Sequence, residues 1–287
     1  MSRLLKTLRG LASLARNPWL LNTVLAADES AWQGRALAHA ARGVTPLGLP
    51  AVPLAVFLAP DDDTVRPFAF GDGGSLPTDL LLLRALARRV PAARYFEIGT
   101  WRGESAANVA EVAASVHTLN LSAPEMRALG LSERYIGLHG YFSRPLANVT
   151  HLHGNSATFD LAALGSFDVV FIDGDHRYEA VRRDTQRVFA HLVGPATVVV
   201  WHDASRQPGQ PRWEVLAGIL DGLPVAATGQ LVQVGNTLCA LYSPVAVPIH
   251  PPDPLADPVP HYELTIRAAG SWRQGTPSPP NSIVKPC

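Results

Sequence analysis

The fold is decided by residues 94–105, whose sequence is RYFEIGTWRGES. Residues 94–98 are typical of a buried strand, and the glycines at 99 and 103 punctuate the turn that follows it. An alanine-rich segment from Glu104 to Ser115 continues with a helical pattern. Glycine lets the backbone turn sharply and approach a ligand closely, and a helix N-terminus favours a negative group. This strand–turn–helix unit predicts a ligand at the carboxyl end of the strand.

The same alternation of strands and helices continues on both sides of this unit. Helices are predicted from Thr78 to Arg89, at 176–192 and at 211–220, and strands at 116–119, 148–152, 167–172 and 196–201. Nearly continuous apolar strands between helices are typical of a parallel sheet covered on both faces. Two last strands, 231–234 and 237–242, flank Gly235-Asn236, which predicts a hairpin with a two-residue, glycine-first turn. The expected fold is α/β, a Rossmann-like doubly wound sheet, mostly parallel, with a C-terminal antiparallel hairpin.

Composition divides the chain into three regions. Residues 1–74 are expected to form an N-terminal helical and irregular extension, 75–243 the α/β domain, and 244–287 a proline-rich C-terminal tail. Within the tail, residues 261–267 alternate in a way that predicts a short strand.

The composition also excludes several classes of protein. Of the 287 residues, 47% are hydrophobic and 17% are charged, which excludes a largely disordered chain. The 24 basic and 24 acidic side chains balance, so no nucleic-acid partner is expected. The two cysteines, Cys239 and Cys287, exclude a disulfide framework or a multi-cysteine metal site. The only lysines, Lys6 and Lys285, lie near the two ends, so the core offers no catalytic lysine.

Residues 2–25 combine a basic start with many leucines, but Arg9 and Arg16 interrupt the apolar stretch, so they are not interpreted as a secretory signal. No run approaches the roughly 20 apolar residues that span a bilayer. One face of the predicted helix carries Leu4, Leu5, Leu8, Leu11, Ala12 and Ala15. We expect this face to dock on the rest of the protein, and peripheral membrane or partner contact by residues 2–16 is the alternative. A cytoplasmic protein is expected, and self-association is left open.

A group of polar residues follows two of the later predicted strands. Asp173 and Asp203 lie at strand ends that the fold would make neighbours. Parallel neighbours lie about 4.8 Å apart, so the two carboxylates could share one cation, and without a cation they would repel each other. His176 and His202 accompany them, and histidine titrates near neutrality. Asp175 is expected to be the N-cap of the next helix.

Together, these motifs resemble class I S-adenosylmethionine-dependent methyltransferases. The pattern Glu97-x-Gly99-x-x-x-Gly103 is similar to motif I of that family. Residues 167–178 and 198–203 are similar to the branch that contains macrolide-sugar O-methyltransferases and cephalosporin-hydroxylase-like proteins. The resemblance covers roughly residues 76–243. It implies transfer of a methyl group to a hydroxyl of a small molecule or sugar.

The resemblance also implies a site for S-adenosylmethionine. It assigns to this cofactor Glu97, Gly99, Thr100, Gly103, Ser105, Asn120, Ser122, Asn155, Ser156 and Asp173. The two glycines would face the methionine part, and Glu97 would hold polar groups nearby. Asn120 and Asn155 stand where the family often has acids, and an amide bonds a hydroxyl without charge assistance. Turn formation is the alternative role for both asparagines.

In the resembled branch, the positions of Asp173, His202 and Asp203 bind a divalent metal such as Mg or Mn. Position 202 is often Glu there, and histidine is a softer ligand, which leaves manganese or another transition metal as alternatives to magnesium. A hydrogen bond from His202 to the substrate is a further alternative. His176 matches the histidine that acts as general base on the substrate hydroxyl. Substrate positioning and helix capping remain alternatives for His176.

Two other functions remain open beside the methyltransferase. One is metal-dependent oxidation or hydrolysis at Asp173, His202 and Asp203. The other is a non-catalytic binding protein on a methyltransferase scaffold, which the asparagines at 120 and 155 favour.

Overall fold

The computed structural model describes residues 3–18, 29–59, 64–71, 73–252 and 262–267. The predictions for residues 19–25, His261 and 268–287 therefore lie outside the described residues. Contacts divide the chain into two units, Met1–Ala256 and Asp257–Cys287. In the second unit, residues 262–267 form neither helix nor strand, so the strand predicted there is wrong for these residues.

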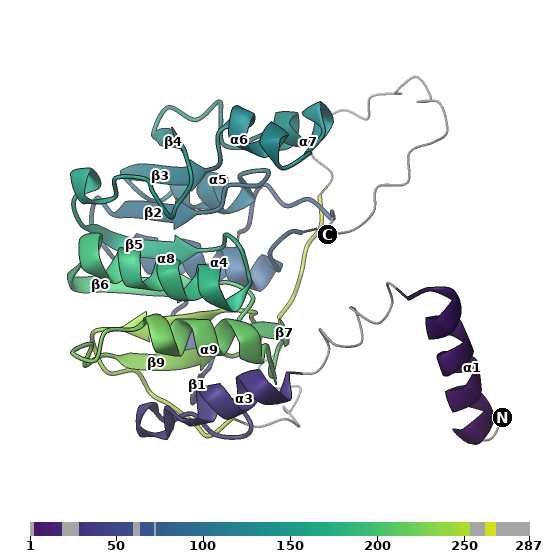
Figure 1. The fold of residues 1–287 in the computed structure, drawn as a ribbon. Coiled ribbons are helices and arrows are strands. Elements are labelled where there is room, and N and C mark those ends of the chain that lie inside the picture. Colours follow the sequence, from purple (N-terminus) through teal and green to yellow (C-terminus); the bar gives the residue numbers. More distant parts are fainter. Residues whose placement is uncertain (1–2, 19–28, 60–63, 72, 253–261, 268–287) are drawn as a thin grey trace. The chain divides into compact units, whose positions relative to one another are not determined.

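An eight-stranded sheet forms the centre of the first unit (Figure 1). The strands are β1 (Ala51–Val52), β2 (Arg94–Ile98), β3 (Ser115–Asn120), β4 (Val149–His153), β5 (Phe167–Ile172), β6 (Val193–Trp201), β9 (Gln230–Val234) and β10 (Ala240–Ser243). They lie in the order β1-β9-β10-β6-β5-β2-β3-β4. All neighbours pair in parallel except β10, which is antiparallel to both β6 and β9. The predicted mostly parallel sheet with a C-terminal antiparallel hairpin is confirmed.

Helices cover both faces of this sheet. Figure 1 shows α8 (Tyr178–His191) and α9 (Trp213–Gly222) in front of the sheet and α4 (Pro77–Arg88) behind it. α5 (Glu104–Ala110) packs against α4, and α3 (Ser30–Leu37) packs against α9. The other elements are α1 (Arg3–Arg16), α6 (Ala123–Ala128), α7 (Glu133–Leu138), short 3₁₀ helices at Ala40–Arg42, Leu54–Val56 and Ala162–Leu164, and a separate ribbon of β7 (Ser205–Gln207) and β8 (Gln210–Pro211). Among the described residues, no helix combines the length and apolar character needed to cross a bilayer.

The register of the central strands brings the site residues to one edge of the sheet. Ile98 of β2 pairs with Ile172 of β5, which pairs with Trp201 of β6. All three of these side chains are buried. The next residues therefore leave the sheet side by side: the amide of Asp173 donates to the carbonyl of Ile98 (2.8 Å), and that of His202 donates to the carbonyl of Ile172 (3.0 Å). This carboxyl edge is where ligands bind in open α/β sheets.

Several predicted boundaries are wrong by a few residues. α5 ends at Ala110 instead of Ser115, and α8 begins at Tyr178 instead of His176. The region predicted as an extension before residue 75 contributes β1, which pairs in parallel with β9 at the sheet edge. Short segments of this kind carry too little periodicity to be found from the sequence.

The turn of the predicted hairpin also differs from the expectation. β10 begins at Ala240, so five residues separate it from β9. The positive φ (62°) belongs to Asn236 and not to Gly235. The hydroxyl of Thr237 donates to the carbonyl of Val234 (2.8 Å) and accepts from the amide of Cys239 (3.0 Å). These side-chain hydrogen bonds stabilise a wider turn than the two-residue type.

Candidate active site

Four residues singled out in the sequence converge at the carboxyl edge of the sheet. Nδ1 of His202 lies 3.2 Å from Oδ1 of Asp173 and 3.4 Å from Oδ2 of Asp203. Nε2 of His176 lies 3.2 Å from the same Oδ2 of Asp203. The structure therefore brings together the two acids and the two histidines, which come from the ends of β5 and β6 and from the loop before α8.

Asp203 faces two histidines and one arginine in this cluster. Its backbone is in the left-handed region (φ 54°), which is uncommon for a residue with a side chain and frequent at functional sites. The Arg212 guanidinium lies 3.8 Å from the carboxylate. Burial alone would raise the pKa of Asp203, but the hydrogen bond from His202 and the charges of His202, His176 and Arg212 lower the pKa to about 2. Asp203 is therefore ionised over the whole neutral range.

A third carboxylate, Asp79, lies on the other side of His202. Asp79 is fully buried in the first turn of α4, and its Oδ2 is 3.1 Å from Nε2 of His202. Burial alone would lower the pKa of His202, but the charge of Asp173 and hydrogen bonds with Asp173, Asp203 and Asp79 raise the pKa well above its ordinary value. The sequence marked Asp79 only as a helix start, because nothing local to it indicates a partner 123 positions away.

His176 lies just before α8 and does not cap it. The N-cap position is Arg177, so the capping alternative for His176 is wrong, as is the N-cap role expected for Asp175. Asp175 instead accepts from the backbone amide of Arg177 (3.0 Å) in a turn before the helix. The His176 side chain is 38% exposed, so a substrate can contact it.

The donor set at this edge fits a divalent metal. One ligand atom from each of Asp173, His176 and Asp203 lies within 4.8 Å of the others. Nδ1 of His202 also faces both carboxylates. Two carboxylates offer hard oxygen ligands, and an imidazole suits manganese, iron or zinc better than magnesium. The geometry therefore places a second histidine, His176, beside the three ligands that the resemblance implies.

Glu97 lies in β2, next to β5, and one of its carboxylate oxygens has no hydrogen-bond partner among the described residues. It is fully buried in β2, and its Oε2 accepts from the Tyr95 hydroxyl (2.9 Å). Burial raises the pKa of Glu97 to about 7, against the opposite effect of the hydroxyls of Ser105, Thr118 and Tyr95. Its Oε1 has no partner with hydrogen-bond geometry in the described part of the chain. Buried polar atoms are nearly always hydrogen-bonded, so this oxygen fits the ammonium of an amino-acid ligand such as S-adenosylmethionine.

Both glycines of the turn after β2 are required by contacts within the protein. Gly99 has φ 99°, and a Cβ there would lie 1.9 Å from the carbonyl oxygen of Asp173. Gly103 has φ 79°, and a Cβ there would lie 2.1 Å from Oγ of Ser143. Thr100 is buried and bonds the hydroxyl of Thr118. Contact of Gly99, Thr100 and Gly103 with a ligand stays a prediction.

Beyond β3, the expected cofactor residues are held by their neighbours. The amide nitrogen of Asn120 donates to the carbonyl of Leu121 (3.2 Å). Ser122 is the N-cap of α6, and its hydroxyl donates to Oε2 of Glu125 (2.6 Å). The bonds from Ser122 and the backbone of Asn155 lower the pKa of Glu125, although burial opposes them. Glu125 thus supplies a carboxylate near the end of β3 that sequence reasoning missed, because it lies on a helix and not at the strand tip.

The predicted residues after β4 are also held within the chain. Oδ1 of Asn155 accepts from the amide of Ala157 (2.9 Å), which is the turn that the sequence offered as the alternative role for this asparagine. The hydroxyl of Ser156 donates to Asp184 on α8 (2.9 Å). Adenine contact by these two residues stays a prediction.

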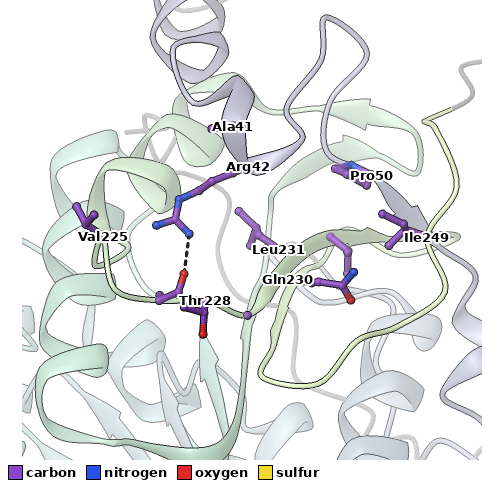
Figure 2. Close-up of a pocket in the computed structure, with 11 residues that line it drawn as sticks. Ala41, Arg42, Pro50, Val225, Thr228, Gln230, Leu231 and Ile249 are labelled. Carbon is purple, nitrogen blue, oxygen red and sulfur yellow. Dashed lines mark hydrogen bonds between the residues drawn. The ribbon is translucent and has the colours of Figure 1, made fainter.

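A separate pocket lies at the opposite edge of the sheet (Figure 2). It has a volume of about 460 Å³ and surrounds the start of β9, which runs parallel to β6, so it faces the amino edge. Arg42 lines this pocket and donates to the carbonyl of Ala227 (3.4 Å). None of the predicted site residues lines it. This pocket is therefore distinct from the cluster at the carboxyl edge.

Comparison with known families identifies the region that carries this cluster. Residues 96–204 match the model of a methyltransferase domain. The match covers less than half of the chain and includes Glu97, Asp173, His176, His202 and Asp203. Residues 96–204 are therefore similar to a methyltransferase domain, in agreement with the resemblance drawn from the sequence. No curated protein matches the chain.

Three solved structures illustrate how distant the similar proteins are. A methyltransferase of Podospora anserina, PaMTH1, bound to SAH, is 17% identical, with 61% of this chain and 82% of that chain covered and a TM-score of 0.43. An O-methyltransferase of Bacillus cereus in complex with SAH is 18% identical, with 60% and 84% covered and a TM-score of 0.42. CalS11, a TDP-rhamnose 3'-O-methyltransferase of calicheamicin biosynthesis, is 16% identical, with 58% and 78% covered and a TM-score of 0.41. At these values the likenesses carry no argument about activity.

Proposed function

We propose that this chain transfers a methyl group from S-adenosylmethionine to an oxygen of a small molecule or sugar hydroxyl. One observation carries the proposal: His176, Asp173 and Asp203 converge at the carboxyl edge of the sheet, within the region that matches a methyltransferase domain. Glu97, whose buried Oε1 has no partner among the described residues, lies in the adjacent strand β2.

Glu97 is the residue that we assign to cofactor binding with the strongest physical argument. S-adenosylmethionine, when bound, supplies an electrophilic methyl group on a sulfonium. Oε1 of Glu97 would accept from the amino-acid ammonium of this cofactor, since no described residue contacts that oxygen with full hydrogen-bond geometry. A positive partner favours the ionised carboxylate, which burial now disfavours.

His176 would act as the general base. The acceptor oxygen forms its bond to the methyl carbon while the bond between sulfur and that carbon breaks, and the hydroxyl proton passes to the imidazole. Because Nε2 of His176 faces Asp203 at 3.2 Å, Nδ1 is the nitrogen that receives the proton. Asp203 would hold the ring in position and stabilise the imidazolium that forms.

Asp173, Asp203 and His202 would hold a divalent metal. Such a metal, when bound, lowers the pKa of a hydroxyl that it contacts. We assign His202 to the metal and His176 to the base because their surroundings differ. His202 is buried and backed by Asp79, as metal-binding histidines usually are, whereas His176 is partly exposed.

The experiment that tests the proposal is calorimetric titration of the full chain with S-adenosylhomocysteine in magnesium, manganese or chelator. We expect micromolar binding that Glu97→Gln weakens by about tenfold or more, because a charge-assisted hydrogen bond is lost. Glu111→Gln is the matched control, since Glu111 pairs with Arg84 and Arg66 away from the cluster. A large residue at Gly99 is a poorer test, because it would displace the backbone of Asp173 with or without a ligand. Absence of binding in every condition would refute the proposal.

A non-catalytic binding protein on the same scaffold is the second candidate function. It is favoured by Asn120 and Asn155, which stand where the resembled family often has acids. Their side chains form local hydrogen bonds within the chain. This candidate predicts binding of S-adenosylhomocysteine without turnover of any acceptor.

Peripheral membrane contact by residues 2–16 is a further part of the proposal. In α1, Leu5, Leu8 and Leu11 are 43%, 55% and 58% exposed, and the helix sequence contains basic but no acidic residues. A helix with these two faces suits an anionic lipid surface. Co-sedimentation of the full chain with anionic vesicles, but not with neutral ones, would support this contact. Equal recovery with both would favour docking of the helix on protein.

A further inference from the structure

Asp79 is a buried carboxylate that the proposed reaction does not use. It is the third residue of α4, and its side chain has no exposure to solvent. Its Oδ2 accepts from the amide of Leu76 (2.7 Å), and its Oδ1 accepts from the amide of Leu238 (2.8 Å). The carboxylate therefore links the start of α4 to the turn between β9 and β10.

His202, at the end of β6, brings a third element to this carboxylate. Nε2 of His202 lies 3.1 Å from Oδ2 of Asp79, while Nδ1 faces Asp173 and Asp203. Asp79 acts as an acceptor toward Leu76 and Leu238, so the proton of this contact belongs to Nε2 of His202. That arrangement leaves Nδ1 as the nitrogen directed toward the two exposed carboxylates.

We propose that Asp79 is a positioning residue that holds His202 with Nε2 protonated and Nδ1 directed at a divalent metal shared with Asp173 and Asp203. The inference rests on the proposed function, because it concerns the same site. A carboxylate behind a metal-binding imidazole fixes the tautomer and the ring orientation. Loss of such a carboxylate typically weakens metal binding by about 10- to 100-fold. Since Asp79 also contacts Leu76 and Leu238, α4 and the β9–β10 turn share the support of His202.

The test is a double-mutant cycle read by manganese binding. Electron paramagnetic resonance of free Mn²⁺ is measured with the full chain and with Asp79→Asn, His202→Gln and the double variant. We expect Asp79→Asn to weaken Mn²⁺ binding by about 10- to 100-fold and to have no further effect in the His202→Gln background. Unchanged affinity in Asp79→Asn, or full additivity of the two changes, would overturn the proposal, as would absence of Mn²⁺ binding to the unchanged chain.

One control variant separates a role in positioning from a role in folding. Glu111→Gln removes an ion pair to Arg84 of the same helix α4 without contacting His202, so it is expected to change the melting temperature but not the Mn²⁺ affinity. A loss of Mn²⁺ affinity in this control equal to that of Asp79→Asn would assign the effect to α4 stability and overturn the proposal.

A measurement on the unchanged chain is needed where Asp79→Asn does not fold. Long-range ¹H–¹⁵N spectra of the chain labelled at histidine, with the diamagnetic ion Zn²⁺, report which nitrogen carries the proton. We expect His202 to be protonated at Nε2 and unprotonated at Nδ1, and the opposite tautomer would overturn the proposal. Titration with S-adenosylhomocysteine is done in parallel. If the chain binds the metal but not S-adenosylhomocysteine, the proposed function is contradicted. The role of Asp79 in metal binding is then still tested by the metal measurements.

Discussion

Two clusters in this molecule use the same types of side chain but differ in their balance of acids and donors. At the first, the Asp221 carboxylate accepts from the Tyr178 hydroxyl (2.7 Å) and contacts Nε2 of His39 (2.7 Å) and the Arg35 guanidinium. Burial opposes ionisation there, but these three hydrogen bonds lower the pKa of Asp221. One acid has three donors, and the cluster joins α3 to α8 and α9.

At the second cluster the balance is reversed. Asp79, Asp173 and Asp203 surround His202, and His176 and the more distant Arg212 also face Asp203. Carboxylates that lie this close to one another repel each other unless a cation lies between them. We therefore interpret Asp221 as a structural link, and the three acids around His202 belong to the ligand site that we propose at the carboxyl edge.

The largest expected effect is a loss of turnover when His176, the proposed general base, is replaced. His176→Ala is expected to lower turnover by about 10²- to 10⁴-fold, the usual contribution of a general base, with the affinity for S-adenosylhomocysteine unchanged. The measurement is methyl transfer to an acceptor found by screening. His191→Ala, at the end of α8, is the control and is expected to retain full activity. Equal turnover by His176→Ala and the unchanged chain would refute the role of His176 as the base, and absence of turnover in both would support the non-catalytic candidate.

The next effect tests whether the first cluster is purely structural. Asp221→Ala removes the acceptor of three donors and is expected to lower the free energy of unfolding by about 2 kcal/mol, without altering the affinity for S-adenosylhomocysteine. Denaturant unfolding and calorimetry measure the two quantities. A parallel loss of affinity would show that the two clusters are coupled.

The third expected effect is a pH dependence that originates at Glu97. The pKa is raised in the folded protein to about 7 from 4.5, so the folded chain holds a proton that the unfolded chain releases. The corresponding stability is fully present below pH 4.5 and is lost as the pH rises through about 7. An ammonium ligand prefers the ionised form, so its affinity should rise by about tenfold per pH unit below that pKa and then level off. Calorimetry across this range should give a flat profile for Glu97→Gln.

The smallest expected effect is a gain in stability from a substitution in α3, the helix that contributes Arg35 to the Asp221 cluster. Gly34 lies inside α3, and a Cβ there would meet nothing within 4 Å. Gly34→Ala should therefore stabilise the chain by about 0.5–1 kcal/mol, because alanine loses less backbone freedom in a helix than glycine does. Thermal unfolding measures the gain, and a decrease in stability would contradict the description of α3.

The order of elements was predictable because each carries a strong local pattern. β2 and β5 were predicted with their observed ends, since both are mostly apolar runs that stop at a glycine or an aspartate. The wide turn at Asn236 was not, because the Thr237 hydroxyl stabilises it through bonds that a dipeptide pattern does not show. β1, with only two residues, exists through its pairing with β9.

Some residues of the candidate site could also be identified from local sequence patterns, and others could not. Asp173, His176, His202 and Asp203 were identified from the sequence because they follow two strands directly, and strand ends meet at one edge of a parallel sheet. Asp79 was missed, since a helix brings it to the site from a position where the local pattern indicates only a helix start.

The sequence by itself determined the α/β order, the motif after β2 and the acids and histidines that follow β5 and β6, because these properties depend on local periodicity and spacing. The tertiary structure alone decided which donor faces which acid. Asp79 contacts His202 across 123 positions, and Oε1 of Glu97 has no partner among the described residues after folding. Hydrogen-bond pairing over such separations depends on how α4, β2 and β6 pack. This packing cannot be inferred from any single segment of the sequence.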